Sequence, residues 1–97
     1  MRTYKLSQEA EEDMHEIYLY SCFHFNKKQA DKYSQKLKTA FDMIVENSKI
    51  GRYYLKANSK YRRFEVNQHI IFYQIIEEAI LIVRILHRDM DIIQIIN

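Results

Sequence analysis

The sequence predicts an α+β fold: an N-terminal strand, a helical hairpin packed on an antiparallel β-sheet, and a short C-terminal helix or tail. Three observations predict it. Two segments of helical apolar periodicity stand in the first half of the chain, and only one or two residues separate them. The second half is rich in β-branched and aromatic residues. The chain contains no proline and one glycine, so no linker interrupts it, and we expect a single domain over residues 1–97.

The first two expected elements are a short strand and a helix. Residues 2–6 alternate in polarity, which predicts the strand. Ser7 is a suitable N-cap for the helix, and the acidic residues that follow it stand where the helix dipole favours negative charge. One narrow stripe of apolar and small residues runs along this helix: Ala10, Met14, Ile17, Tyr18, Ser21 and Phe25.

A second helix is expected to begin after Asn26. Asn26 followed by Gln29 resembles a capping box, in which an N-cap side chain accepts a hydrogen bond from the backbone three residues later. Because the connection between the two helices is so short, they are expected to run antiparallel. The apolar stripe of the second helix comprises Ala30, Tyr33, Leu37, Ala40, Phe41 and Ile44.

The remainder of the chain is expected to form the sheet. Gly51, the one glycine, is assigned to a loop position with positive φ. Residues 62–66 alternate as a strand, and Asn67–Gln68 suits a tight turn. Residues 69–76 and 79–86 are expected to form a β-hairpin around two central glutamates. A helix is the competing interpretation of this run, but its dense β-branching favours strands.

Both faces of the expected strand 69–76 are apolar, although an antiparallel sheet commonly exposes one polar face. The helical hairpin is expected to cover one face. The other face needs a cover as well, either residues 92–96 or another protein chain. Because exposed apolar patches of this size usually mark binding sites, the pattern favours a scaffold built for a partner.

Several classes of function are excluded or disfavoured. Glu77 and Glu78 interrupt the apolar run, so it is not expected to span a membrane. Cys22, the single cysteine, has no partner for an internal disulfide, and the N-terminal residues contain no apolar signal segment, so we expect a cytoplasmic protein. A single glycine cannot build a phosphate-cradling loop, and no metal-ligand spacing is present; neither a cofactor nor a metal is expected.

Positive charge is concentrated locally, although the net charge is only +2. The segment 49–64 is a basic patch, with Arg52, Arg62 and Arg63 among its six Lys or Arg residues and no Asp or Glu. It suits either a solvated loop or a phosphate-binding surface. Arg62 and Arg63 form a larger set with Arg84, His87 and Arg88. If the five side chains converge on one sheet edge, they suit phosphodiester binding or cleavage. The alternative is that Arg84 is a snorkelling or ion-paired residue of the sheet and that His87 caps its strand.

The order of residues resembles the ParE toxins of the ParE/RelE superfamily. The likeness covers essentially residues 4–91. It begins with the motif Tyr4-x-Leu6-Ser7-x-x-Ala10-x-x-Asp13-Met14 and continues through Gln29-Ala30-x-x-Tyr33 and Ile50-Gly51. Its most specific part lies near the end of the chain, in His69-Ile70-Ile71-Phe72-Tyr73 and Val83-Arg84-Ile85-Leu86-His87-x-x-Met90-Asp91.

The resemblance implies the toxin of a type II toxin–antitoxin system, neutralised in a hetero-oligomer by a ParD-like antitoxin. It implies a poison of DNA gyrase that stabilises the cleaved-DNA complex, touches DNA only indirectly and has no active site of its own. By resemblance, gyrase is expected to contact Arg84, His87, Arg88 and Met90. The antitoxin is expected to contact Met14, Tyr18, Tyr33 and Leu37.

Two other functions remain open at this point. RelE-like members of the superfamily cleave mRNA on the ribosome. By resemblance they carry an arginine where this chain has Ile70 and a tyrosine near Gln94. An mRNA endonuclease would therefore have to rely on Arg63, His87 and Arg88. The third alternative is a ParE-fold binding module that has lost toxicity.

Overall fold

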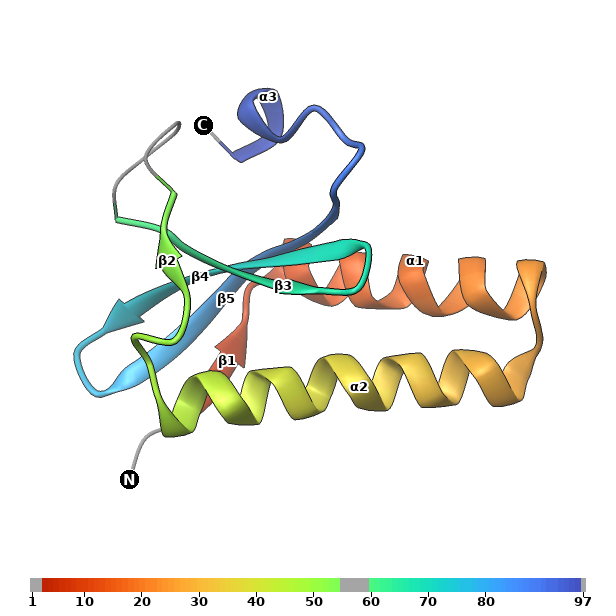
Figure 1. Cartoon of the computed structure of the whole chain (residues 1–97), viewed down its shortest axis with the longest axis horizontal. Helices are drawn as coiled ribbons and strands as arrows, with labels where there is room; N and C mark the ends of the chain where they lie inside the picture. Colours follow the sequence, from red (N-terminus) through yellow and green to blue (C-terminus); the bar gives the residue numbers. More distant parts are fainter. Residues whose placement is uncertain (1–2, 55–59, 97) are drawn as a thin grey trace.

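The computed structural model describes residues 3–54 and 60–96 as a helical hairpin on one side of a five-stranded sheet (Figure 1). The helices and strands in chain order are β1 (Tyr4–Leu6), α1 (Gln8–His24), α2 (Lys27–Glu46), β2 (Arg52–Tyr53), β3 (Arg62–Val66), β4 (His69–Ile76), β5 (Ala79–His87) and α3 (Ile92–Ile96). The predicted α+β class is confirmed. In the described part of the chain, no helix is long and apolar enough to cross a bilayer.

The sheet is mixed, with strand order β1-β5-β4-β3-β2. The four strands from β2 to β5 pair antiparallel, as predicted, whereas β1 lies parallel to β5. A parallel pair needs a long crossover, and here the whole intervening chain supplies it. The two-residue strand β2 was not predicted: it extends the sheet within the segment expected to be a loop.

Side-chain caps fix the starts of both long helices, as the sequence predicts. The Ser7 hydroxyl accepts a hydrogen bond from the backbone N–H of Ala10 at 3.0 Å, and Asn26 Oδ1 accepts one from Gln29 at 2.8 Å. The Ser7 hydroxyl also donates to the Val83 carbonyl at 2.7 Å, which ties the start of α1 to β5. The inclusion of Phe25 in the buried stripe is wrong. It lies at the C-cap, past the last turn of α1, and is 69% exposed.

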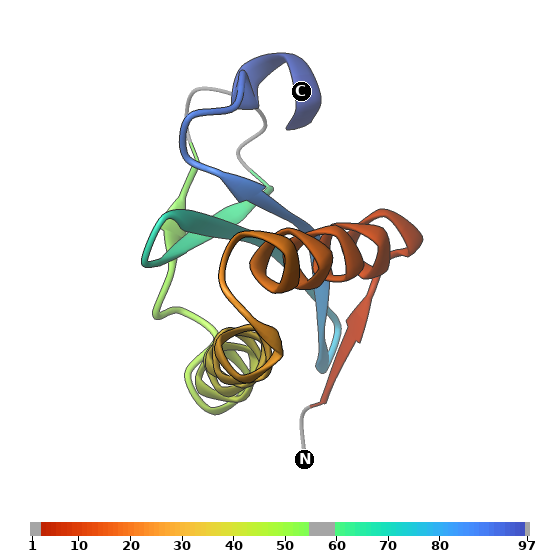
Figure 2. The ribbon, with the colours of Figure 1, turned by 90° about the vertical axis from the view of Figure 1, so that its right-hand side faces the viewer.

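The helical hairpin covers one face of the sheet and α3 lies over the other (Figure 2). A separate apolar cluster lies on each face. The larger cluster lies under the helical hairpin and includes Leu37, Phe41 and Ile44 of α2. The smaller one lies on the opposite face, where α3 packs Ile92 and Ile96 against the sheet. The sequence left two candidates to cover the second face, residues 92–96 or another protein chain. In the structure, residues 92–96 cover it.

Gly51 is required for close packing rather than for an unusual backbone angle. No glycine has positive φ, so the predicted reason is wrong. A Cβ atom at Gly51 would lie 2.6 Å from both the Arg63 carbonyl oxygen and the Tyr73 hydroxyl. That hydroxyl accepts a hydrogen bond from the Gly51 N–H at 2.9 Å and donates one to the Ser48 carbonyl at 2.8 Å. The positive φ angles fall instead at Asn67 and Glu77, in the two hairpin turns.

Candidate functional site

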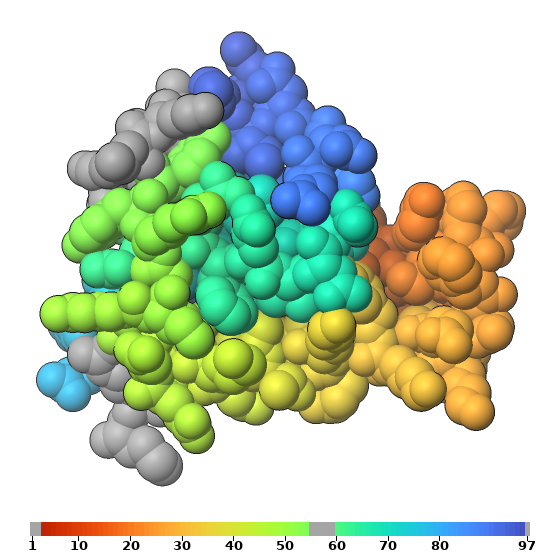
Figure 3. Space-filling view, in the orientation of Figure 1, coloured from red at the N-terminus to blue at the C-terminus, as the bar shows by residue number. Residues whose placement is uncertain are grey.

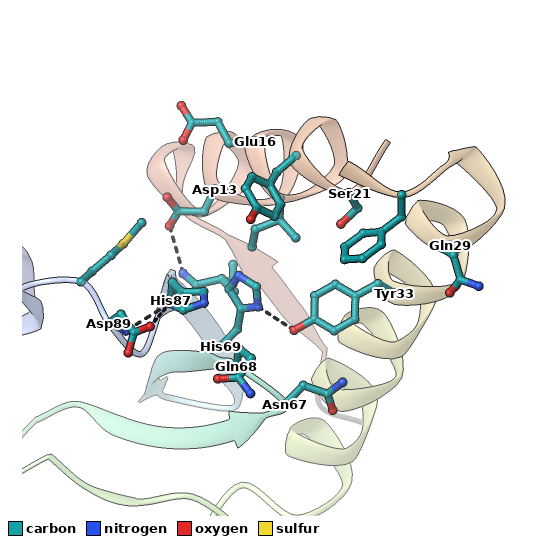
Figure 4. A pocket seen from close by; sticks show the side chains of 15 residues that line it. Asp13, Glu16, Ser21, Gln29, Tyr33, Asn67, Gln68, His69, His87 and Asp89 are labelled. Carbon is teal, nitrogen blue, oxygen red and sulfur yellow. Dashed lines mark hydrogen bonds and ion pairs between the residues drawn. The ribbon is translucent and has the colours of Figure 1, made fainter. Parts of the chain in front are cut away.

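A groove of about 770 Å³ opens between the outer half of the helical hairpin and the end of the sheet (Figures 3 and 4). Tyr33 of α2 and His69 at the start of β4 lie in this groove, where α2 meets the sheet. His87 ends β5, and Met90 follows it in the turn before α3. The groove therefore brings together residues that are far apart in the sequence.

A tyrosine–histidine contact joins the hairpin to the sheet inside the groove. The Tyr33 hydroxyl lies 2.6 Å from Nδ1 of His69, and it also lies within 3.3 Å of the Val66 carbonyl, to which it donates. Burial of the His69 ring, with a smaller contribution from the neighbouring His87, lowers its pKa to about 4. Burial also raises the pKa of Tyr33. At neutral pH both side chains are therefore uncharged.

The second histidine of the groove lies against the first. The rings of His69 and His87 are nearly perpendicular, with centroids 5.4 Å apart. Nδ1 of His87 accepts a hydrogen bond from the backbone N–H of Asp89 at 3.1 Å, and the Asp89 carboxylate is 3.7 Å from the same atom. The turn after β5 therefore holds the His87 ring at the mouth of the groove, where it caps its strand.

An ion pair joins α1 to β5 beside the groove. Arg84 donates through Nε to Asp13 Oδ2 at 2.8 Å and through a terminal nitrogen to Oδ1 at 3.0 Å. The same carboxylate accepts the backbone N–H of Ile85 at 2.9 Å. Asp13 is 9% exposed, and its hydrogen bonds raise the pKa of Arg84. Sequence reasoning missed this role of Asp13, because its partner lies 71 residues away and neither periodicity nor spacing links the two.

The predicted cationic residues do not gather at one sheet edge. Arg84 pairs with α1, whereas Arg62 and Arg63 lie on β3, and β4 separates the two strands. Arg63 and Arg88 both approach the Glu65 carboxylate, at 2.7 and 4.0 Å. The alternative considered from the sequence, that Arg84 is an ion-paired residue of the sheet, is confirmed, and its partner Asp13 lies on α1.

The residues predicted to bind partners fall into three places. His87, Met90 and Tyr33 line the groove, with Arg88 exposed next to them. The second group lies on the hairpin, where Met14 packs half-buried and Tyr18 donates to Asp31 at 2.7 Å. Leu37 has no exposed surface; it belongs to the core, out of reach of any partner that binds the folded chain.

Residues suited to metal binding do not cluster in the parts of the chain that the structure describes. Over residues 3–54 and 60–96, no three His, Cys, Asp or Glu side chains are placed to hold an ion together. Cys22 is half-buried on α1 as a free thiol. The groove is thus lined by apolar and aromatic side chains, two imidazole rings and several amides, with carboxylates at its margin, and its chemistry is suited to contact with a partner.

The fold of the chain is shared with a known structure. The structure matches a solved structure of the chromosomal ParDE TA system from P. aeruginosa with a TM-score of 0.79, covering 90% of this chain and 96% of that one. At 17% sequence identity, this match establishes the fold alone: that of a small α+β domain.

The sequence comparisons define the family. The family model of the ParE toxin of type II toxin–antitoxin systems, parDE, matches residues 4–92. Toxin ParE1 of Caulobacter vibrioides is 31% identical over 91 residues, which is 94% of each chain. Toxin ParE1 of Mycobacterium tuberculosis (strain H37Rv) is 31% identical over 90 residues, or 92% of each. The chain belongs to the ParE toxin family, which confirms the resemblance seen in the sequence.

Proposed function

We propose that this ParE toxin poisons DNA gyrase by stabilising the cleaved-DNA complex, without an active site of its own, and that a ParD-like antitoxin neutralises it. One observation carries the choice of gyrase over RNA cleavage. The arginines that a phosphodiester-cleaving site would need are divided between two separate acidic partners and do not surround one phosphate. Arg84 is held by Asp13, and Arg63 shares the Glu65 carboxylate with Arg88.

Cleavage of mRNA needs a charge clamp and an acid or base around one phosphate. Ile70 occupies the position where the nuclease branch is expected to carry an arginine, and it is 3% exposed in the core opposite the hairpin. Of the remaining candidates, His87 lies in the groove, whereas Arg63 interacts with Glu65 on β3. This separation supports a protein-binding toxin.

The target-binding surface in this proposal is the mouth of the groove. Met90 is 49% exposed and provides an apolar contact, while Arg88 supplies a positive charge next to it. His87 lies between these residues and the groove interior. Arg84 takes part indirectly: its ion pair with Asp13 fixes the strand from which the other three residues extend.

The antitoxin-binding surface in this proposal is the outer part of the helical hairpin. Four large apolar side chains are exposed there. Their exposed fractions are 51% for Leu19, 60% for Tyr20, 87% for Phe23 and 69% for Phe25. Their concentration at the tip favours burial by a partner. An antitoxin segment that folds on binding would cover them and reach Met14, Tyr18 and Tyr33.

The test is a supercoiling and DNA-cleavage assay with purified gyrase, run beside a ribosome-dependent mRNA cleavage assay. We expect relaxed and cleaved plasmid to accumulate while the mRNA stays intact, and the cognate antitoxin to restore supercoiling. His87→Ala and Arg88→Ala should weaken inhibition, whereas Lys32→Ala on the exposed side of α2 serves as the matched control. Cut mRNA with unaffected gyrase would reject the proposal. A chain that neither arrests growth nor inhibits gyrase would be the non-toxic binding module.

A further inference from the structure

The edge of the sheet formed by β2 and β3 is the most basic part of the chain. Residues 47–64 contain six Lys or Arg residues and no Asp or Glu. The structure describes residues 47–54 and 60–64 of this segment. We define the β2–β3 basic surface by four residues on the two paired strands: Arg52, Tyr53, Arg62 and Arg63. Because successive residues alternate between faces, Arg52 and Arg63 lie on one side of this edge and Tyr53 and Arg62 on the other, so the surface wraps around the edge of the sheet.

Strand pairing places positive charges against each other on this surface. Arg52 and Arg63 are direct cross-strand partners. Like charges in directly opposed positions destabilise an antiparallel pair. The Glu65 carboxylate binds Arg63 at 2.7 Å, but Arg52 is exposed and makes no hydrogen bond or ion pair with the described residues. A bound anion would offset this repulsion.

The neighbouring cross-strand pair combines a guanidinium with an aromatic ring. Tyr53 pairs with Arg62, and the Arg62 guanidinium carbon lies 4.1 Å from the centre of the Tyr53 ring. One terminal nitrogen donates to the Gly51 carbonyl at 2.7 Å. Ring and carbonyl together fix the plane of the guanidinium, whose other N–H groups remain available for the forked contacts that arginine makes with phosphate.

We propose that the β2–β3 basic surface binds backbone phosphates of DNA. This inference rests on the proposed function, because a toxin seated on gyrase lies close to gyrase-bound DNA. It replaces the indirect contact expected from the resemblance with a direct one. The exposed Arg52 guanidinium and the half-buried guanidinium groups of Arg62 and Arg63, beside the exposed Tyr53, match the chemistry of phosphate contacts, which position a protein on DNA without reading its sequence.

The location of the surface is compatible with simultaneous binding to gyrase. In Figure 3 the β2 segment and the groove are seen on one face of the molecule, on opposite sides of it. Residues His87 and Met90 at the groove mouth therefore remain accessible while the basic surface touches DNA. The two surfaces are also chemically different, since apolar, uncharged polar and acidic side chains and two histidines line the groove, whereas arginines dominate the β2–β3 surface.

The experiment measures binding of the full chain to a fluorescent DNA duplex by anisotropy over a series of salt concentrations. About three phosphate contacts predict a slope of log affinity against log salt of about −2.7. Arg52→Gln combined with Arg63→Gln should weaken binding about tenfold or more and reduce the slope by about 2. Arg52→Glu alone, at an exposed position without partners among the described residues, tests the same surface without disturbing Arg63.

The matched control is Lys28→Gln combined with Lys32→Gln, which removes the same charge from exposed positions in the first half of α2. The proposal requires this control to bind within about twofold of the unmodified chain, because phosphate binding follows local charge. Equal loss in both double variants would overturn it, as would tighter binding to an RNA strand or to an acidic peptide than to the duplex. So would an absence of binding at low salt.

Gyrase assays on the same preparations separate this inference from the function on which it rests. If the unmodified chain inhibits gyrase while DNA binding is insensitive to Arg52 and Arg63, the DNA surface is rejected and the gyrase proposal stands. If the chain leaves gyrase active but loses DNA binding in the double variant, the phosphate-binding surface is supported and the gyrase proposal fails.

Discussion

The contact between the helical hairpin and the sheet has a closed end and an open end. At the closed end Phe41 and Ile44 of α2 pack on Ile80 and Ile82 of β5 without exposed surface. At the open end the same two layers enclose a groove of about 770 Å³. Apolar burial holds the first end, and a few polar contacts hold the second.

The polar contacts lie where the hairpin still touches the sheet beside the groove. Asp13 binds Arg84 there, and Tyr33 meets His69. Polar contacts of this kind are directional, so they fix a spacing between the layers that apolar packing alone would close. The comparison indicates that the closed end provides most of the stability, whereas the open end keeps a surface available for partners.

Truncation at the closed end should have the largest effect on stability. Phe41→Ala removes a ring that is 1% exposed, and we expect the free energy of unfolding to fall by about 4 kcal/mol because a cavity remains. Urea denaturation followed by circular dichroism measures the change. Met43→Ala, on an exposed side chain of the same helix, is the control and should cost less than about 1 kcal/mol. Similar losses at both positions would contradict the assigned packing.

Removal of the ion pair at the open end should have the next largest effect. Asp13→Ala leaves Arg84 and the Ile85 N–H without their acceptor, so we expect a loss of about 3 kcal/mol in the free energy of unfolding. A double-mutant cycle with Arg84→Met measures the coupling between the two side chains. A coupling indistinguishable from zero would show that the pair does not join the layers.

The open end should also make stability depend on pH. Because His69 has a pKa of about 4 in the folded chain and about 6.5 when unfolded, the unfolded state binds more protons between these values. Stability from this group is therefore complete well above pH 6.5 and falls with decreasing pH. The two pKa values give a loss of about 3 kcal/mol at pH 4, which solvent screening of the half-buried ring reduces to about 2 kcal/mol.

Urea midpoints of the unmodified chain and of His69→Gln over this pH range test the prediction. The difference between the two curves isolates the histidine from the carboxylates that also titrate in acid. A difference that does not change between pH 7 and pH 4 would mean that the ring is not buried in its neutral form.

Loss of the Tyr33 hydroxyl should have the smallest effect. Tyr33→Phe keeps the ring but removes the contacts to His69 and the Val66 carbonyl, and we expect it to reduce the free energy of unfolding by about 1 kcal/mol. The His69 ring protons, followed by NMR, should shift because their nearest polar neighbour is gone. Unchanged chemical shifts would show that the Tyr33 hydroxyl does not contact the His69 ring.

The closed end was largely predictable from the sequence, and the open end was not. Helical periodicity placed Phe41 and Ile44 on the apolar stripe that became the core, because the position of a side chain around a helix follows from its spacing. Leu37 lies on the same stripe, but the expected antitoxin contact at this residue is wrong because it is fully buried. The caps at Ser7 and Asn26 were predictable for the same local reason.

Contacts between distant residues left no pattern in the sequence. The hydrogen bonds of Asp13 to β5 and of Tyr33 to His69 depend on how two layers meet. The close approach of Tyr73 to Gly51 is also a contact between distant residues. It is the reason that glycine is needed at this position, whereas the sequence had suggested a positive φ. Predicted partner contacts at His87 and Met90 could be placed in the groove only once the fold was known.

The most direct test of the account is supercoiling inhibition by the double variant Arg88→Ala with Met90→Ala. Both side chains are exposed beyond β5, so the variant should melt at the same temperature as the unmodified chain and still bind its antitoxin. If the open end is where gyrase binds, the concentration needed for half-inhibition rises about tenfold or more. A variant that traps cleaved DNA as well as the unmodified chain would show that gyrase binds elsewhere.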